Sequence, residues 1–245
     1  MVKQDEFLWV EKYRPQNIED CILPDSIKST FKEFIAAGDM PNLLLSGTAG
    51  TGKTTIAKAL CNELGYTSLV VNGSLDRNID TLRNEIASFA STVSFDGGKK
   101  CIILDEADYL NPQSFQPALR GFIETFSKNV RFILTCNFKD KIIEPIHSRT
   151  TLIDFRTEKK EMPEIMGVLM KRILNILKEE TVKVEDPKIV AEVIKKHYPD
   201  IRRILNEMQR YSAGGVIDIG ILANVGETDV TSLMKYLKDR DFGKM

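Results

Sequence analysis

The stretch Ser46-Gly-Thr-Ala-Gly-Thr-Gly-Lys-Thr-Thr55 decides the fold of this chain. It fits the pattern G-x-x-x-x-G-K-[ST], whose glycines let successive backbone N–H groups converge on phosphate oxygens. In this pattern Lys53 reaches the β and γ phosphates and the hydroxyl of Thr54 faces a Mg²⁺ ion, while a helix starting here adds the positive end of its dipole. The stretch therefore predicts a nucleotide site formed by Gly47, Thr48, Ala49, Gly50, Thr51, Gly52, Lys53, Thr54 and Thr55.

The segments on either side of the loop have the character that the pattern requires. Residues 42–46, NLLLS, form a short apolar run typical of a buried parallel strand, and Ile56, Leu60 and Leu64 follow with helical spacing. Strand, loop and helix are thus in the required order. An ordinary glycine-rich turn is the alternative, and both flanks argue against it.

Composition and charge limit the other classes of function. The chain of 245 residues is 42% hydrophobic and 28% charged. It has neither a run of eighteen apolar residues nor a signal-peptide pattern, which favours a globular protein at work in the cytoplasm with no membrane partner. The four cysteines are far apart and there are only two histidines, so neither a zinc site nor a disulfide framework is indicated. With a net charge of −1, any nucleic-acid contact must come from a local basic patch.

Apolar runs alternate with helical segments up to about residue 157. This alternation predicts an α/β fold with a five-stranded parallel sheet covered by helices on both faces. One covering helix is expected at Ile79–Phe89, whose apolar residues share a face. The expected strands are Leu43–Leu45, Leu69–Val71, Cys101–Leu104, Phe132–Thr135 and Leu152–Phe155.

Strand signals cease after about Arg156, and the chain that follows has helical spacing. A nucleotide-binding domain is therefore expected over residues 1–157 and a small helical domain over residues 158–228, with one more helix in residues 229–245. The helices expected in the second domain are 163–180, 188–197 and 200–212, the last of them stopped by Gly214 and Gly215.

Two carboxylates follow the third expected strand, in Cys101-Ile-Ile-Leu-Asp-Glu106. Because the carboxyl ends of parallel strands meet at one edge of a sheet, Asp105 and Glu106 are expected beside the phosphate loop. Asp105 would hold the Mg²⁺ shell, and Glu106 would orient and deprotonate an attacking water. The alternative is a pair of solvated acids ending a strand. The position of the pair in an α/β chain with a phosphate loop favours hydrolysis.

Two further polar residues follow later strands. Asn137 ends the fourth expected strand and is placed to hydrogen-bond the γ phosphate or the attacking water. Arg149 comes at the end of the sheet domain, too late in the order to curl into its own site. Such an arginine usually forms only a weak surface ion pair. The sharper interpretation is an arginine finger given to a neighbouring subunit, which makes hydrolysis depend on assembly.

Together these residues resemble the AAA+ superfamily of ATPases and, within it, the sliding-clamp loaders. Trp9-Val-Glu-Lys-Tyr-Arg-Pro15 looks like the opening box of loader subunits, and Ser148-Arg149 looks like their serine–arginine finger motif. Pro199-Asp-Ile-Arg-Arg203 resembles the sensor 2 segment of the lid domain. Gln116-Pro-Ala-Leu-Arg120 resembles the stretch that links the nucleotide site to the DNA-facing helices. The resemblance runs from Trp9 to Leu237.

The resemblance implies a role for each matching residue. It places Arg202 on the γ phosphate, and it gives Gln116 and Arg120 the role of coupling the site to DNA. It implies ATP hydrolysis with Mg²⁺, Arg149 acting in trans, and as partners a sliding clamp, primer–template DNA and other loader subunits in a hetero-pentamer. The residues implied to lie over the adenine and ribose are Val10, Tyr13, Arg14 and Pro15.

Within the loaders, residues 89–97 and 20–24 are similar to the ATPase subunit of T-even-type tailed phages more than to cellular loaders. A phage origin would place the protein in the host bacterial cytoplasm. Thr150 departs from the pattern, since a cysteine normally completes the finger motif. The helical domain corresponds to the lid, and residues 229–245 correspond to the start of a truncated collar or to a tail. A fragment, a split gene and a weakly assembling subunit are the alternatives.

The resemblance also implies a DNA contact where the helix at Ile79 begins. Arg77, Asn78, Ile79 and Arg83 match the region with which loaders grip the phosphates of DNA. Backbone N–H groups and arginines at a helix start form a ready phosphate site, which reads shape and not base sequence. The alternative is that the arginines lie on a solvated helix face.

Two other functions stay open on the sequence alone. One is another DNA-directed AAA+ machine, such as a branch-migration motor or a helicase loader. The other is a structural subunit that binds nucleotide as a brace and does not hydrolyse it. Lys53, Asp105, Glu106 and Asn137 argue together against the brace, because a brace needs no acid to activate water.

Overall fold

A computed structural model describes residues 7–74, 79–92, 98–218 and 220. For residues 79–82 it gives the backbone alone. The chain divides into two compact units, the first of which comprises Met1–Ile165 with Pro199–Arg202 and the second Met166–Tyr198 with Arg203–Met245. The first unit carries the phosphate loop.

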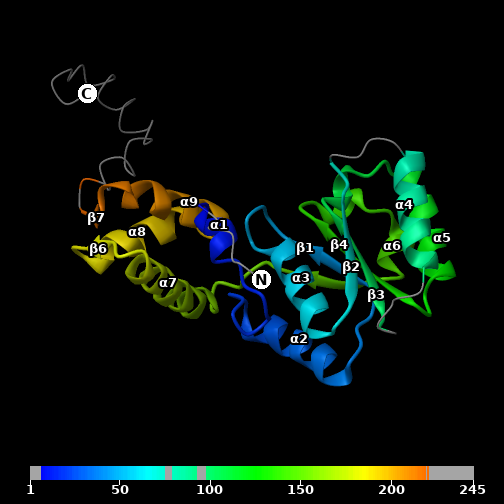
Figure 1. Ribbon diagram of the computed structural model, residues 1–245, viewed down its shortest axis with the longest axis horizontal. Coiled ribbons are helices and arrows are strands. Elements are labelled where there is room, and N and C mark those ends of the chain that lie inside the picture. Colours follow the sequence, from blue (N-terminus) through cyan, green and yellow to red (C-terminus); the bar gives the residue numbers. More distant parts are fainter. Residues whose placement is uncertain (1–6, 75–78, 93–97, 219, 221–245) are drawn as a thin grey trace, which may run out of the picture. The chain divides into compact units, whose positions relative to one another are not determined.

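The first unit is built on a five-stranded sheet (Figure 1). Its strands are β1 (Leu43–Ser46), β2 (Thr67–Asn72), β3 (Lys100–Asp105), β4 (Val130–Cys136) and β5 (Thr151–Asp154). Their order is β2-β3-β4-β1-β5, and every neighbouring pair is parallel. Continuous apolar runs suit such strands, because helices cover both faces of a parallel sheet. This confirms the α/β fold and the five strands that the sequence predicts.

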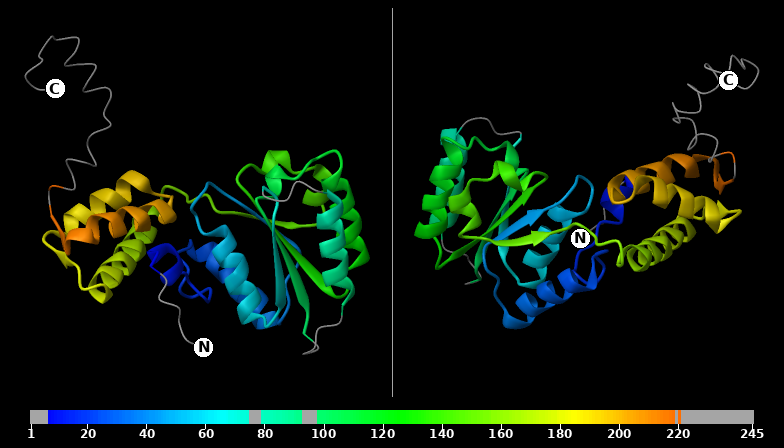
Figure 2. Two further views of the ribbon diagram at one scale, coloured as in Figure 1. Left: turned by 45° about the horizontal axis from the view of Figure 1, so that its top comes forward. Right: turned by 180° about the vertical axis from the view of Figure 1, so that it is seen from behind.

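Helices pack on both faces of the sheet (Figure 2). One face is covered by α2 (Asp25–Ala37) and α3 (Lys53–Glu63), and the other by α4 (Ile79–Ser91), α5 (Phe115–Thr125) and α6 (Glu144–His147). Since successive side chains of a strand point to opposite faces, Leu43 of β1 packs with Phe31 of α2, and Leu44 packs on the other side with Leu119 of α5. All four side chains are fully buried, and burying each one contributes about 1.5–3 kcal/mol.

The carboxyl ends of three strands meet at one edge of the sheet. Ser46 of β1 pairs with Cys136 of β4, and Leu104 of β3 pairs with Leu134 of β4. The chain continues from these strand ends into the phosphate loop, Glu106 and Asn137. The topology thus gathers segments that are far apart in sequence, at the edge where ligands of open α/β sheets bind.

Helix α2 is an element that the pattern analysis does not identify. Its apolar residues Ile27, Phe31 and Ile35 nevertheless have helical spacing and pack on the core. Gly38 follows the helix with φ +67°, a left-handed conformation typical of a helix end. These signals were sufficient to predict the helix. The first unit also contains the short helices α1 (Trp9–Lys12), η1 (Ala107–Tyr109) and η2 (Lys139–Lys141).

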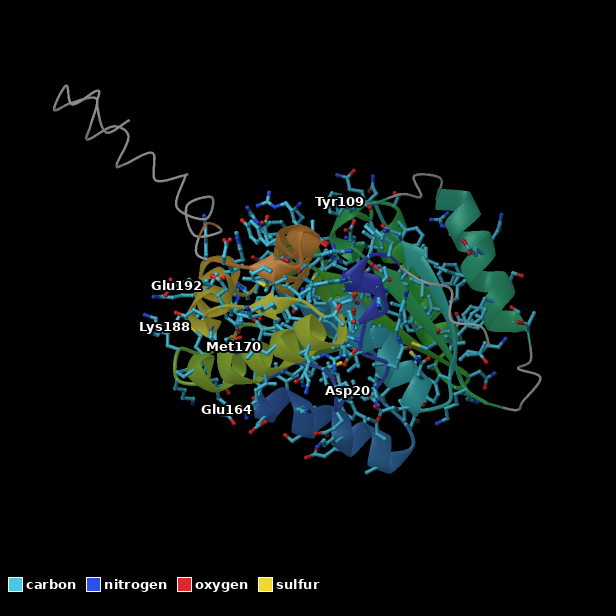
Figure 3. The ribbon with its side chains drawn as sticks, turned by 60° about the vertical axis from the view of Figure 1, so that its left-hand side comes forward. Asp20, Tyr109, Glu164, Met170, Lys188 and Glu192 are labelled. Carbon is cyan, nitrogen blue, oxygen red and sulfur yellow. The ribbon has the colours of Figure 1, made fainter. Side chains whose placement is uncertain are left out.

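The second unit consists mainly of helices, as the sequence predicts. Asp186 caps helix α8 by accepting a hydrogen bond from the Lys188 backbone N–H at 2.8 Å. Lys188 and Glu192 are exposed (Figure 3), whereas Ile189 and Val193 are buried. The helices are α7 (Met162–Glu179), α8 (Pro187–His197), α9 (Ile201–Tyr211) and η3 (Ser212–Gly214), the first residues of α7 and α9 belonging to the first unit.

The expectation that strands end after about Arg156 is wrong in one detail. Strand β6 (Lys183–Val184) pairs in parallel with β7 (Val216–Ile217). Two-residue strands carry no alternation of apolar and polar side chains, so their pairing is decided by the helices that bring them together. Local sequence has no signal for it.

Other predictions about chain organisation stay predictions. The helix expected in residues 229–245 lies outside the described residues. The domain boundaries near residues 157 and 228 are likewise still expectations. In the part of the chain that the structure describes, no helix is long and apolar enough to cross a membrane.

Asp39 joins the starts of several strands at the amino edge of the sheet. Its carboxylate accepts hydrogen bonds from Arg131 Nη2 at 2.8 Å, Lys99 Nζ at 2.6 Å and Tyr66 Oη at 2.6 Å. Burial by itself raises the pKa of Asp39, but the hydrogen bonds from Arg131, Lys99 and Tyr66 together hold it well below its ordinary value near 3.8. The carboxylate is therefore more stable ionised in the folded chain than in the unfolded chain.

Replacing Asp39 by alanine is expected to lower the free energy of unfolding by about 2 kcal/mol at pH 7, because Arg131 loses its charged partner. A lowered folded-state pKa stabilises the fold above the unfolded pKa, so this contribution is lost as the pH falls below about 4. Urea unfolding at pH 7 and pH 3 should show a smaller difference between parent and Asp39→Ala at pH 3. As the matched control, Asp20→Asn at an exposed carboxylate (Figure 3) should change stability by less than about 0.5 kcal/mol. A difference that is the same at both pH values would contradict the ionic origin.

Candidate active site

The phosphate loop runs from β1 into α3 and depends on glycine at two positions. Gly50 has φ +76°, and Gly52, which directly precedes the first residue of α3, has φ +87°. Both values lie in the left-handed region that other residues rarely adopt. Gly50 also lies against Asp200, since an added Cβ would come within 1.8 Å of the Asp200 Oδ1 atom. Larger residues at either position would force the loop to change shape.

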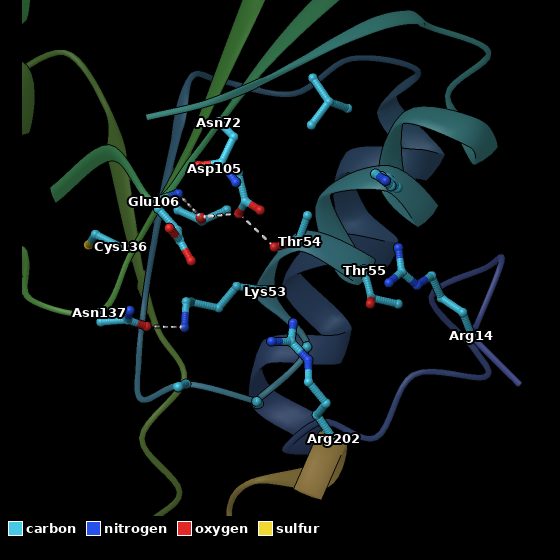
Figure 4. Close-up of a pocket in the computed structure, with 16 residues that line it drawn as sticks. Arg14, Lys53, Thr54, Thr55, Asn72, Asp105, Glu106, Cys136, Asn137 and Arg202 are labelled. Carbon is cyan, nitrogen blue, oxygen red and sulfur yellow. Dashed lines mark hydrogen bonds between the residues drawn. The ribbon is translucent and has the colours of Figure 1, made fainter. Parts of the chain in front are cut away.

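A cavity of about 260 Å³ opens beside this loop (Figure 4). It brings together residues from three strand ends, the loop, the first turns of α3, and the segments around residues 14 and 202. Eleven of the predicted site residues line it: Arg14, Ala49, Gly50, Gly52, Lys53, Thr54, Thr55, Asp105, Glu106, Asn137 and Arg202.

Lys53 lies beneath the loop and is nearly buried. Its ammonium group donates hydrogen bonds to the carbonyl oxygens of Gly47 and Thr48, both at 2.8 Å, and to Asn137 Oδ1 at 3.0 Å (Figure 4). Burial lowers the pKa of Lys53. All three ammonium donors thus point at oxygen acceptors, and phosphate oxygens can take the place of the carbonyl groups.

Thr54 and Asp105 are directly bonded. Thr54 Oγ1 donates to Asp105 Oδ1 at 2.6 Å, and Thr135 Oγ1 donates to the same carboxylate oxygen at 2.6 Å (Figure 4). The strand β4 hydroxyl therefore fixes the carboxylate that ends β3 against the start of α3. The link joins three separate segments of the chain at one atom.

The donors of this pair suit a Mg²⁺ ion. Magnesium prefers oxygen ligands and is usually held by one or two protein groups together with water and substrate phosphates. A hydroxyl and a carboxylate beside a phosphate loop meet that requirement. Among the described residues, no group of three or more His, Cys, Asp or Glu side chains is placed to hold a metal ion.

Glu106 has an unusual backbone. Its φ of +55° and ψ of +45° place a residue with a side chain in the left-handed region, just before η1. The backbone N–H of Glu106 donates to Thr135 Oγ1 at 3.1 Å. Strained backbone of this kind persists where surrounding bonds impose it and is concentrated at functional sites. The turn leaves the Glu106 carboxylate at the cavity (Figure 4).

Several positive side chains line the cavity besides Lys53. Arg14 and Arg202 are predicted residues, and Lys58 of α3 joins them. Arg14 also pairs with Glu11 at 2.5 Å. A concentration of cations in a partly enclosed cavity favours a ligand with several negative charges, such as a nucleoside triphosphate.

Six predicted nucleotide contacts are not among the residues that line the cavity: Val10, Tyr13, Pro15, Gly47, Thr48 and Thr51. Gly47 and Thr48 instead accept the Lys53 hydrogen bonds, and Thr51 Oγ1 donates to the Thr48 carbonyl at 2.9 Å. The ring of Tyr13 stands edge-on to Trp9, with ring centres 6.3 Å apart. These residues shape the loop and the α1 segment.

Arg149 does not line this cavity. It follows α6, and its Nε and Nη2 donate to Glu124 Oε1 at 2.8 and 2.5 Å. Its guanidinium lies at the last turn of α5 instead. Its action on a neighbouring chain stays a prediction.

The predicted DNA and coupling residues are described in part. Arg77 and Asn78 lie outside the described residues, and Ile79 begins α4. Arg83 Nη2 donates to the Ser114 carbonyl at 3.2 Å, just before α5. Arg120 is exposed on the same helix.

Gln116 is buried and fully hydrogen-bonded. Its Nε2 donates to the carbonyl oxygens of Leu110 and Lys141 at 3.0 and 3.1 Å, and its Oε1 accepts from the Ile143 N–H at 2.8 Å. It therefore ties η1 and α5 to the segment that leads into α6. A side chain so bonded cannot move without displacing its neighbours.

Sequence reasoning missed five cavity residues: Lys58, Val70, Asn72, Thr135 and Cys136. Asn72 was open to prediction because it is a polar residue ending a strand, as Asn137 is. Thr135 was not, because a threonine inside an apolar strand is ordinary, and only the alignment of β3 with β4 brings its hydroxyl to Asp105.

This geometry can bind a nucleoside triphosphate and activate a water for attack on its last phosphate. The loop and cations suit the phosphates, the Thr54–Asp105 pair suits the metal, and Glu106 supplies a carboxylate in the same cavity. A family model, ATPase family associated with various cellular activities (AAA), matches residues 43–159. The fold and the site thus define an AAA ATPase.

More specific matches extend over the whole chain. The family model of the sliding-clamp-loader large subunit, AAA+ ATPase lid domain, matches residues 159–223. The sliding-clamp-loader large subunit of Escherichia phage RB69 is 38% identical, covering 100% of this chain and 77% of the relative. The sliding-clamp-loader large subunit of Enterobacteria phage T4 is 39% identical, covering 98% of this chain and 76% of the relative. The replication factor C small subunit of Saccharolobus solfataricus is 40% identical over 89% of this chain and 65% of its own length. The chain belongs to the family of sliding-clamp-loader large subunits.

Solved structures show the same fold. The Holliday junction branch migration motor RuvB of Thermotoga maritima matches with a TM-score of 0.67 and 20% identity, covering 89% of this chain and 72% of that one. An identity this low carries information about the fold alone. The closer sequence relatives therefore decide the family.

Proposed function

We propose that this chain is an ATP-driven subunit of a sliding-clamp loader, one of several loader subunits in a hetero-pentamer. ATP binding assembles the subunits into a spiral that holds an open clamp and primer–template DNA, and ATP hydrolysis releases the closed clamp on the DNA. Clamp loading takes place in the cytoplasm, which is that of the host bacterium if a phage encodes the chain. Family membership and the eleven predicted site residues that line the cavity support this proposal.

The phosphate loop and its neighbours hold the nucleotide in this proposal. Backbone N–H groups of the loop and the Lys53 ammonium bind the phosphates, and Arg14 lies near the base and ribose with the rest of the α1 segment. Thr54 and Asp105 hold Mg²⁺, which neutralises developing charge on the phosphate oxygens when bound. The 2.6 Å bond between the two residues supports their shared role.

Glu106 orients the attacking water and accepts its proton, while Asn137 fixes the γ phosphate or the water. Arg202 contacts the γ phosphate from within the same chain, and Arg149 of the neighbouring chain completes the site. Hydrolysis then requires two adjacent subunits, which makes it a signal that assembly is complete. Arg149 bonds to Glu124 and does not line the cavity of its own chain, which supports a role in trans.

DNA is held by its phosphates at the start of α4. Ile79 contributes its backbone N–H there and Arg83 adds a positive charge, together with Arg77 and Asn78. Gln116 and Arg120 of α5 transmit DNA binding to the nucleotide site. The three hydrogen bonds of Gln116 support this role, because they join η1, which follows Glu106, to the segment before α6.

The observation that carries the proposal is the presence of Glu106 in the cavity of a chain similar to loader subunits along its whole length. A nucleotide brace needs no such carboxylate. A branch-migration motor shares the fold, but the 20% identity to RuvB favours no shared function.

The decisive test is steady-state ATP hydrolysis by the chain assembled with the other loader subunits, with and without clamp and primed DNA. A low rate that rises many-fold only when clamp and primed DNA are both present is the expected result. Stimulation by DNA with no response to the clamp would indicate another DNA motor. Tight ATP binding without hydrolysis under any condition would indicate a brace.

A further inference from the structure

The guanidinium of Arg149 is held by its own chain on almost every side. Nε and Nη2 donate to Glu124 Oε1 at 2.8 and 2.5 Å, and Nη1 donates to the Pro145 carbonyl at 2.8 Å and to Ser148 Oγ at 3.1 Å. An arginine has five N–H donors, and within the described part of the chain these four bonds leave one of them, on Nη2. The side chain is thus ordered before any partner arrives.

The carboxylate that holds it occupies an unfavourable place. Glu124 lies in the last turn of α5, where the helix dipole is negative and disfavours an acid. The Glu124 side chain is half exposed, so packing in the core does not explain an acid at this position either. A residue that breaks a local rule is expected where a particular partner compensates for it. Arg149 is that partner.

Helix α5 provides a rigid frame for this contact. At its first turn Gln116 is bonded to the Lys141 carbonyl and the Ile143 N–H, immediately before α6. At its last turn Glu124 is bonded to Arg149, immediately after α6. The short helix α6 is therefore attached to α5 at both ends, and the orientation of Arg149 follows that of α5.

We propose that Glu124 is the positioning residue for Arg149 as an arginine finger. It holds the guanidinium in one orientation. The remaining donor and the positive charge can then contact the γ phosphate of ATP bound to the neighbouring subunit without a change of side-chain rotamer. This inference rests on the proposed role of Arg149 in trans. Glu124 does not line the cavity of its own chain and is not itself a catalytic residue. Transition-state stabilisation depends on such prior orientation.

The test compares Glu124→Gln and Glu124→Asp in the assembled loader with clamp and primed DNA. Glutamine keeps the size of the side chain but removes the charge, so kcat for ATP hydrolysis is expected to fall about tenfold, with KM for ATP and ATP affinity of the isolated chain unchanged. Aspartate keeps the charge and should recover part of the loss. The matched control, Glu144→Gln, removes a carboxylate from the first turn of α6 and should retain the parent rate. A fall in ATP affinity or in thermal stability that matches the loss of rate would overturn the positioning role.

Mixing experiments locate the defect. A Glu106→Gln chain has an inactive cavity but an intact Glu124–Arg149 pair, so adding it should raise the rate of Glu124→Gln chains above that of either variant alone. Arg149→Ala, measured in parallel, separates the two proposals. If Arg149→Ala retains activity, the trans finger itself is wrong. If Arg149→Ala is inactive but Glu124→Gln is as fast as the parent, only the positioning role is wrong. A faster Glu124→Gln loader would show that Glu124 restrains the finger, which also overturns the proposal.

Discussion

Replacing Glu106 by glutamine is expected to lower ATP hydrolysis by about 10²–10³-fold and to leave ATP binding nearly unchanged. Glutamine has nearly the same shape as glutamate but cannot accept the proton of the attacking water. The Glu106 backbone is held by the bond to Thr135 Oγ1, so the substituted side chain should occupy the same place in the cavity. The variant should therefore bind ATP and assemble, but stop before clamp release.

Single-turnover hydrolysis and equilibrium binding of ATP, measured on the same preparation, separate the two effects. The matched control is Asp140→Asn, which removes an exposed carboxylate beyond Asn137 and should hydrolyse ATP at the parent rate. If Glu106→Gln hydrolyses ATP within about threefold of the parent, Glu106 is not the general base, and the role of its strained backbone needs another explanation.

Arg149→Ala is expected to have the larger effect on the assembled loader, a loss of about 10³-fold or more in kcat, as is found when an arginine finger is removed. ATP affinity of the isolated chain should be unchanged, because Arg149 does not line the cavity of its own chain. The loss of kcat has an electrostatic cause, because the charge that develops on the transferred phosphate is no longer stabilised by a cation from the neighbouring subunit.

Mixing the two inactive variants provides the sharpest measurement. Arg149→Ala chains keep a working cavity and Glu106→Gln chains keep a working finger, so some neighbouring pairs in a mixture regain a complete site. The mixture should hydrolyse ATP faster than either variant alone at the same total concentration. Mixing Arg149→Ala with a chain that carries both substitutions is the control and should recover nothing. Equal recovery in both mixtures would contradict action in trans.

The sequence alone determined the part of this protein that depends on local patterns. The loop of residues 47–54 needs glycines and a lysine at fixed spacing, so its binding of phosphate can be predicted without a structure. Apolar runs of three or four residues predicted the five strands, and the carboxyl ends of parallel strands lie at one edge of the sheet. Asp105, Glu106 and Asn137 could be placed in one site for that reason.

Only the tertiary structure decided the contacts made between distant segments. Thr135 bonds to Asp105 because β4 lies beside β3, and Glu124 bonds to Arg149 because α5 packs near α6. The pairing of β6 with β7 likewise depends on the helices around it. A local pattern records which element a segment forms, whereas these bonds depend on which elements become neighbours after folding. Which elements become neighbours depends on burial of the whole core, and no short stretch of sequence determines it.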